Sequence, residues 1–323
     1  MKQKKKIVAI GGGTGLSTLL RGLKKYENID ISAIVTMMDD GGSSGRLKKE
    51  FGSLPPGDIR NCLIALSTKE NVLTKIFNYR FPVTKKKPQV GGHSLGNLLM
   101  IALSDIYGGF DKAIKKISEI LSIKGKVLPI TLQPAQLVAV LEDGKKTIGE
   151  TKISKSEKPI IKLSLNPSKV KHYPEVVNEI LSADMIVVGP GSLFTSLLPN
   201  LLIEEVSNAI SRSLAKKVYI CNIMTQPSET DGYSVEDHIK KIYEHCRNKF
   251  FFDYVIVNKG KLPQEVLNKY IKDKSLPVRI KNIKILKNLA KNVIQKNLVS
   301  ITKKEKFVRH HYDKLAKLIL KIL

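Results

Sequence analysis

Residues 11–17 read GGGTGLS and place four glycines and two hydroxyl residues at the end of an apolar run. Glycine lets a phosphate approach the backbone closely, and the N-terminus of a following helix supplies oriented N–H groups with partial positive charge. The turn therefore predicts a site for the diphosphate of a nucleotide or for a sugar. Its candidate ligand residues are Gly12, Gly13, Thr14 and Gly15.

This turn departs from two standard phosphate-binding motifs. The dinucleotide motif GxGxxG needs a glycine where Leu16 stands, and no lysine follows the glycines as a Walker A loop requires. The sequence therefore does not specify NAD or ATP. A tight strand-to-helix turn is the simpler alternative, but such a turn would need fewer glycines.

Residues 39–46 read DDGGSSGR and place two carboxylates beside a hydroxyl-rich loop in a chain of net charge +26. An acid at the end of the second strand can accept hydrogen bonds from a ribose or sugar diol, and the same carboxylates could instead hold Mg²⁺. The serines can form an anion nest, and the arginine can clamp a phosphate. A solvated Asp-Gly turn is the alternative. The candidates are Asp39, Asp40, Gly42, Ser43, Ser44 and Arg46.

Two further motifs precede predicted helices. In residues 54–61 (LPPGDIRN), Asp58 can cap the helix, while Arg60 and Asn61 fall in its first turn and either support the cap or contact a ligand. In residues 91–97 (GGHSLGN), His93 can be a general base or a phosphate donor, although a lone histidine is often structural. Asn97 closes the same motif and is also a candidate.

A second strand–glycine–helix turn follows in residues 188–196 (VGPGSLFTS), and residues 222–227 (NIMTQP) leave another strand into a polar turn. The former is a second potential phosphate cradle. Two such turns predict a ligand that spans the crevice between two halves of the sheet. The candidates are Gly189, Gly191, Ser192, Thr195, Thr225 and Gln226.

The elements that must position these motifs alternate between strand and helix. Residues 4–10, 16–26 and 29–37 predict a strand, a helix and a strand, which form a βαβ unit with a parallel sheet and a right-handed crossover. Further along, the pattern predicts helices at 58–68, 94–107 and 235–247 and strands at 183–189, 216–224 and 252–258.

The middle of the chain follows a different pattern. Residues 136–150 form two extended runs around Asp143-Gly144, a strong hairpin signal, and residues 158–165 predict another strand. We therefore predict an α/β fold with a Rossmann-like, doubly wound, mostly parallel sheet. One domain is expected over residues 1–323, with a β-rich insertion or accessory segment at about 123–170.

Composition limits the class of protein further. The chain has 323 residues, of which 42% are apolar, and no run approaches the ~20 apolar residues of a membrane span. The apolar run after the basic N-terminus is too short for a signal peptide, so we expect a cytoplasmic protein without a transmembrane segment. Cys62, Cys221 and Cys246 are widely spaced, which indicates reduced thiols and no metal site.

The excess positive charge is concentrated in residues 259–323, which hold 18 Lys and Arg against four Asp and Glu. Such a tail can bind nucleic acid or an anionic membrane surface. Here, however, the lysines stand singly among Ile, Leu and Asn, and aromatic residues for base stacking are scarce. We expect solvated faces and no specific nucleic-acid partner, while an anionic partner stays open.

Taken in order, the motifs GGGTGLS, DDGGSSGRL, PPGDIRN, GHSLGNLL, GPGSLFTS and NIMTQPSET closely resemble the YvcK-type gluconeogenesis factor family, the bacterial branch of the CofD-like superfamily. The resemblance covers residues 7 to about 320. It implies a Rossmann-like fold that binds a UDP-sugar, notably UDP-N-acetylglucosamine. It also implies a role in growth on gluconeogenic carbon sources, cell shape and envelope synthesis.

Two positions in the last third of the chain also match. Arg309 lies in Val-Arg-His, which is similar to the family's Ile-Arg-His, and the resemblance implies that this arginine and Tyr270 bind the UDP-sugar. The family follows Arg-His with Asp-Thr, whereas this chain has His311 and Tyr312. Regulation through a threonine at that position is therefore not expected. Ser228 stands where the family commonly has glycine.

Two functions follow from the motifs and the resemblance. The first is a nucleotide-sugar-binding regulatory protein without turnover, because no complete catalytic constellation is present. The second is a CofD-like transferase in which Asp39 or Asp40 holds Mg²⁺ and His93 is a base; the CofD branch transfers a phospholactyl group onto a deazaflavin with Mg²⁺. A UDP-sugar is the expected ligand, and Mg²⁺, a cell-envelope or metabolic regulatory protein and a homo-oligomer stay open as partners.

Overall fold

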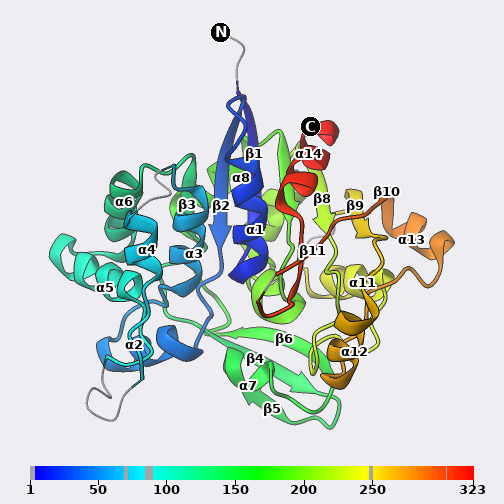
Figure 1. Cartoon of the computed structure of the whole chain (residues 1–323), viewed down its shortest axis with the longest axis horizontal. Helices are drawn as coiled ribbons and strands as arrows, with labels where there is room; N and C mark the ends of the chain where they lie inside the picture. The colour runs from blue at the N-terminus through cyan, green and yellow to red at the C-terminus, as the bar shows by residue number, and fades with distance from the viewer. Residues whose placement is uncertain (1–3, 69–71, 84–89, 247–249, 303) are drawn as a thin grey trace.

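A seven-stranded parallel sheet forms the centre of the molecule (Figure 1). The computed structural model describes residues 4–68, 72–83, 90–246, 250–302 and 304–323. The strands of the sheet are β1 (Lys5–Gly11), β2 (Ile29–Val35), β3 (Lys126–Pro129), β7 (Met185–Val188), β8 (Lys216–Ile220), β9 (Phe252–Asn258) and β10 (Ala290–Lys296). Their order is β10-β9-β8-β7-β1-β2-β3, and each neighbouring pair is parallel.

The chain builds this sheet outward from β1 in two directions. The strands β1, β2 and β3 form one half, and the chain then returns to place β7 beside β1 and adds β8, β9 and β10 on the other side. The strand order therefore reverses between β1 and β7, and ligands of open α/β sheets bind outside the carboxyl ends of the strands at such a switch point. The predicted doubly wound fold is confirmed, and this sheet is parallel throughout.

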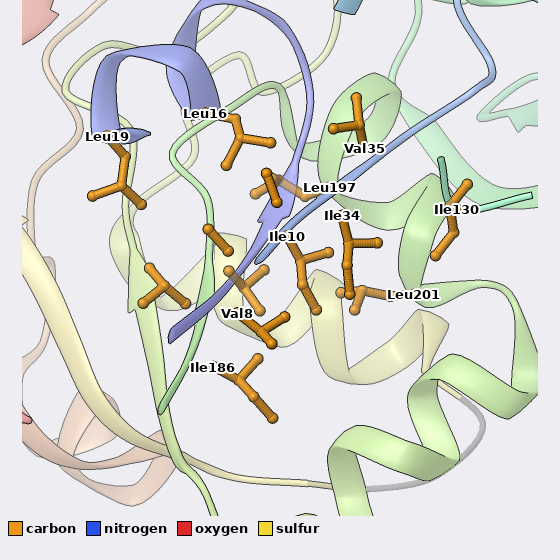
Figure 2. Close-up of a cluster of buried hydrophobic side chains, with 14 of the residues drawn as sticks. Val8, Ile10, Leu16, Leu19, Ile34, Val35, Ile130, Ile186, Leu197 and Leu201 are labelled. Atoms are coloured by element: carbon orange, nitrogen blue, oxygen red, sulfur yellow. The ribbon is translucent and has the colours of Figure 1, made fainter. Parts of the chain in front are cut away.

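Apolar and largely β-branched sequences form the central strands. β1 (KKIVAIG) pairs with β7 (MIVV) in a register that places Ile10 opposite Val188, and both side chains are at most 1% exposed. Such strands are buried on both faces because helices cover both sides of a parallel sheet. Figure 2 shows Ile10 in one cluster with Leu197 and Leu201 from the segment after β7. Each fully buried side chain of this kind contributes ~1.5–3 kcal/mol.

Helix α1 (Gly13–Leu23) begins directly after β1 and packs against α3 (Gly57–Leu66) and α14 (Tyr312–Ile322) (Figure 1). The contact with α14 is close at Gly22, where an added Cβ would lie 2.3 Å from the Tyr312 carbonyl oxygen. Lys25 and Asp313 form an ion pair of 2.7 Å beside this contact. The last helix of the chain is therefore fixed to the first.

The predicted helices 58–68, 94–107 and 235–247 correspond to α3, α5 and α11. α11 ends at His245, and the last residue of that prediction, 247, lies outside the described residues. None of the described helices is long and apolar enough to cross a membrane. Other helices of the chain are α4 (Val72–Asn78), α5 (Leu95–Tyr107), α6 (Phe110–Leu121), α8 (Pro174–Leu181), α10 (Glu204–Arg212), α11 (Val235–His245), α12 (Gln264–Lys272) and α13 (Ile283–Leu289).

A separate three-stranded antiparallel sheet stands below the central sheet in Figure 1. It consists of β4 (Gln136–Leu141), β5 (Lys146–Ile148) and β6 (Ile160–Asn166), in the order β5-β4-β6, with the short helix α7 (Glu150–Ile153) between β5 and β6. The predicted hairpin is present, and Gly144 adopts the positive φ of 80° that its turn requires. The predicted segment 123–170 is broader than this sheet, because β3 belongs to the central sheet.

The stretch after β2 corrects one prediction. The sequence indicated a loop over residues 39–46, but α2 begins at Gly42 and runs to Phe51. Its glycine- and serine-rich start has low intrinsic helix propensity. The helix forms because Ser43, Ser44 and Leu47 are buried against neighbouring elements, and tertiary packing supplies most of the stability of short helices.

Candidate functional site

A cavity of about 570 Å³ lies at the switch point of the central sheet. Its walls come from the turns after β1, β7 and β8 and from β12 (Val308–His310), which pairs antiparallel with β11 (Val299–Ile301). The cavity brings together eleven of the residues predicted from the sequence. They are Gly12, Gly13, Thr14, Gly15, Gly191, Ser192, Thr195, Thr225, Gln226, Tyr270 and Arg309.

The two glycine turns of this cavity pack backbone against backbone. A Cβ at Gly15 would lie 2.3 Å from the carbonyl oxygen of Pro190 and 3.0 Å from the Gly191 nitrogen. Gly12, which precedes the first turn of α1, offers no capping side chain. Gly12, Gly13, Thr14 and Gly15 line the cavity at this turn, and glycine is needed at position 15 because the second turn occupies the space where a side chain would stand.

Tyr270 and Arg309 also line the cavity. The backbone N–H of Val308 donates a hydrogen bond of 2.8 Å to the Tyr270 hydroxyl, so the tyrosine fixes β12 in place. The Arg309 guanidinium lies 5.1 Å from the centre of the Phe307 ring, within cation–π range. Among the described residues that line the cavity, Arg309 is the one lysine or arginine. It is the cavity's principal positive group.

Buried carboxyl groups give the cavity and its surroundings an unusual protonation state. Burial, followed by the neighbouring Asp39, raises the pKa of Asp58 to about 7. Burial, followed by Asp39 and Asp40, raises the pKa of Glu150 to about 7. Asp40 also accepts a hydrogen bond of 2.8 Å from the backbone N–H of Thr151, which ties the acidic stretch to α7. Near neutral pH, two of these carboxyls are therefore only partly ionised.

Four of the predicted residues form a separate buried network between α2, α3 and α5. The Ser43 hydroxyl lies 2.9 Å from His93 Nδ1 and accepts a hydrogen bond of 2.9 Å from the Asn97 side chain. Arg60 donates to the Asn97 side-chain oxygen at 2.9 Å and to the Ser94 hydroxyl. Burial lowers the pKa of His93, which favours its neutral form. These side chains bond one another, although the buried Arg60 Nε has no hydrogen-bond partner, and they do not line the cavity.

The other predicted residues outside the cavity also bond within the protein. Arg46 donates to the Gly91 carbonyl at 2.7 Å, and Ser44 accepts from the Gly57 N–H at 3.2 Å. Asn61 accepts from Arg60 at 2.8 Å. Gly42 and Gly189 adopt positive φ values of 48° and 85°. These glycines thus shape the start of α2 and the turn after β7.

The cavity contains polar residues that the sequence did not single out. Their positions depend on elements distant in sequence, such as α7 for Glu150 and the loop after β8 for Glu229. Burial lowers the pKa of one of them, His310, to about 4, so this histidine is neutral. These additional lining residues are Thr18, Glu150, Ser154, Ser196, Asn222, Glu229, Asp273, Ser275 and His310.

The acidic residues do not form a ready-made metal site. Within the described part of the chain, no three His, Cys, Asp or Glu side chains are grouped so that they could hold a metal ion. Asp39 already accepts the Gly41 N–H at 2.9 Å, and Asp58 accepts the Gly13 N–H. Magnesium binding stays a prediction. The cysteines Cys62, Cys221 and Cys246 are buried free thiols.

Fold and cavity together define a Rossmann-type α/β protein with a ligand cavity at its switch point. The family model of the 2-phospho-L-lactate transferase CofD matches residues 7–299. The chain therefore belongs to the CofD family, and within it to the proteins named gluconeogenesis factors.

Curated relatives with that name match nearly the whole of this chain. The "Gluconeogenesis factor" of Bacillus subtilis is 44% identical, with 100% of this chain and 99% of the relative covered. The protein of the same name from Listeria innocua is 43% identical, with 99% and 96% covered. The crystal structure of a UPF0052-family protein from Bacillus halodurans matches with a TM-score of 0.92 at 43% identity, covering 98% of this chain and 99% of that one.

Proposed function

We propose that the protein binds a nucleotide sugar of the UDP-N-acetylglucosamine type and acts as a regulatory protein. The observation that carries this proposal is the cavity at the switch point, which is lined by both the glycine turn of α1 and Arg309. Its volume of about 570 Å³ lies within the range of small-molecule sites.

The chemistry of the walls suits the parts of such a ligand. Backbone N–H groups at the start of α1 and the Arg309 guanidinium can bind a diphosphate. The Gln226 side chain lines the cavity and can hydrogen-bond sugar or base groups, while Asn222 bonds Gly191. The partly protonated Glu150 can accept from a hydroxyl or donate to one.

The regulatory part of the proposal rests on the family, whose curated relatives are named gluconeogenesis factors, and on motifs that suit phosphates and diols without a complete catalytic constellation. We infer that ligand binding, rather than turnover, is the output, and that a metabolic or cell-envelope protein in the cytoplasm receives the signal. Roles in gluconeogenic growth and cell shape belong to the same proposal.

Isothermal titration of the full chain with UDP-N-acetylglucosamine tests the ligand. Arg309→Ala should weaken binding ~10–100-fold, because a charge-assisted hydrogen bond contributes about 1.5–3 kcal/mol. Arg212→Ala is the matched control, since Arg212 is an exposed arginine at the end of α10 and does not line the cavity. No binding by the unmodified protein at millimolar ligand would contradict the proposal.

A CofD-like transferase is the second candidate function. The observation in its favour is the match of the CofD family model to residues 7–299, and Asp39 or Asp40 would then hold the Mg²⁺ that supports phosphoryl-group chemistry. Incubating the protein with Mg²⁺ and a nucleotide-linked substrate should then give a product, and Asp40→Asn should abolish its formation. Ligand binding that is independent of metal, without any product, argues against this candidate.

A further inference from the structure

The second glycine turn of the cavity continues into a short helical segment, η1 (Leu193–Leu197) followed by α9 (Leu198–Leu201). Three donors lie at the start of this segment: the hydroxyls of Ser192 and Thr195 and the backbone N–H of Phe194. At the first turn, Thr14 is exposed and lines the cavity, while the Ser17 hydroxyl donates to the Thr14 carbonyl oxygen at 3.0 Å. At the second turn, one acidic side chain of the protein takes all three donors.

That side chain is Glu229. Ser192 donates to one of its carboxylate oxygens, and the Thr195 hydroxyl lies 3.3 Å from the other. The Phe194 N–H also donates to this carboxylate. Glu229 is only 5% exposed although it lines the cavity. A carboxylate thus stands where the hydroxyls and N–H group could otherwise hold an anionic group of a ligand.

The loop after β8 holds Glu229 rigidly in this position. The Glu229 N–H donates to the Gln226 carbonyl at 3.1 Å, and the Thr230 N–H donates to the same oxygen at 2.9 Å. The Thr230 hydroxyl accepts from the Gln226 N–H at 2.8 Å. Asn222 bonds both backbone groups of Gly191, at 3.2 and 2.8 Å, and so fixes the second turn from the same side. The loop that carries Glu229 and the second glycine turn are therefore both held in place before any ligand binds.

We propose that Glu229 is a specificity-determining residue: it fills the anion cradle of the second glycine turn, so that the cavity takes a ligand with one anionic centre. This inference rests on the proposed function, because it assigns the ligand's diphosphate to the first turn and Arg309. The end of the ligand that reaches Ser192 and Thr195 must then be uncharged. A neutral sugar or base fits this requirement, whereas a sugar phosphate or a sugar acid placed there meets the Glu229 carboxylate and is repelled.

Sulfate is a suitable probe because it is a small dianion whose charge does not change between pH 5 and pH 8. Titration calorimetry of the full chain at pH 7.5 should show one bound sulfate for the unmodified protein. Glu229→Ala should bind two, because truncation frees the three donors. Glu229→Gln should bind one, because the amide has the shape of the carboxylate and still fills the cradle. Asp273→Ala, which removes an exposed carboxylate from the same cavity, should also bind one.

Sulfate binding by Glu229→Ala that equals binding by Asp273→Ala would overturn the inference, because loss of charge alone would then explain it. If Glu229→Ala does not fold, as judged by circular dichroism, Glu229→Ser provides the same opening with a small polar side chain. The gained sulfate should disappear when Thr195→Val is added. Titration with UDP-N-acetylglucosamine separates the two proposals: failure of the unmodified protein to bind it contradicts the proposed function, while a sulfate gained by Glu229→Ala still supports the role of Glu229.

Discussion

The two glycine turns of the cavity have similar sequences and opposite surroundings. Each follows a buried strand of the central sheet and precedes a helical segment. At the first turn, the nearest carboxyl is Asp58, which bonds the Gly13 N–H but does not line the cavity. At the second turn, the carboxyl of Glu229 lines the cavity and bonds Ser192 and Thr195. A carboxyl inside the cavity, such as Glu229, blocks anion binding at its turn, whereas a carboxyl outside the cavity, such as Asp58, does not.

This difference shows that a glycine-rich turn alone does not determine whether an anion binds there. The local sequence fixes the backbone path and the donors. Glu229, more than thirty positions from Ser192, supplies the carboxyl that fills the second turn. No such group lies in the cavity at the first turn among the described lining residues that bond it. The two turns share a contact between Gly15 and the Pro190–Gly191 backbone.

The largest effect on stability is expected for Gly15→Ala, which disrupts the packing of both turns. The added methyl group would stand 2.3 Å from the Pro190 carbonyl oxygen, and a backbone atom cannot move away cheaply. The free energy of unfolding should fall by ~3 kcal/mol, measured by urea denaturation. Gly144→Ala is the control, because nothing lies within 4 Å of its Cβ position and only its positive φ opposes the change. Equal losses for the two variants would show that the turns do not pack as described.

A smaller effect is expected for Glu229→Ala on stability. Its loss leaves the Ser192 and Thr195 hydroxyls without a charged acceptor, which should cost ~2 kcal/mol in thermal or urea unfolding. Thr14→Ala at the first turn should cost less than ~0.5 kcal/mol, because Thr14 is exposed and its hydroxyl takes part in no described hydrogen bond. If both substitutions cost the same, the contrast between a filled and an open turn is wrong.

The carboxyl behind the first turn should make stability depend on pH. The pKa of Asp58 is raised from 3.8 to about 7, so the folded state binds a proton more tightly than the unfolded state. Its contribution to stability is therefore complete below about pH 4 and is lost as pH rises toward 7. Relative to the unmodified protein, Asp58→Asn should gain ~2 kcal/mol between pH 5 and pH 7. A difference that is constant across this range contradicts the raised pKa.

The smallest effect is expected in the loop that carries Glu229. Ser228 has a positive φ of 71°, a conformation that disfavours residues other than glycine. Ser228→Gly should relieve this strain and stabilise the protein by ~0.5 kcal/mol after the entropy cost of glycine, visible as a small rise in Tm. Ser182→Gly, at a residue with φ of −90°, has no strain to relieve and should lower Tm instead.

The sequence predicted those features that local residues determine. The alternation of apolar runs with glycine turns was enough to predict the strand β1, the helix α1 and the switch point, because the local sequence of each element indicates its structure. The network of Ser43, His93 and Asn97 shows the limit of this reasoning. Those residue types suit a ligand site, but the helix α2 directs Ser43 toward α5, and its formation depends on packing that no local pattern reveals.

The close contact of α14 with Gly22 has a mechanical consequence for the cavity. Arg309 precedes α14 by a few residues, and α1 carries the glycine turn at its other end. The two walls that face the ligand are thus joined through a stiff pair of helices, rather than by a hinge. Entry of a ligand should therefore require little movement of the walls, and less of the intrinsic affinity is lost to ordering the protein. The eleven residues of α14, which do not line the cavity themselves, thus stabilise the shape of its walls.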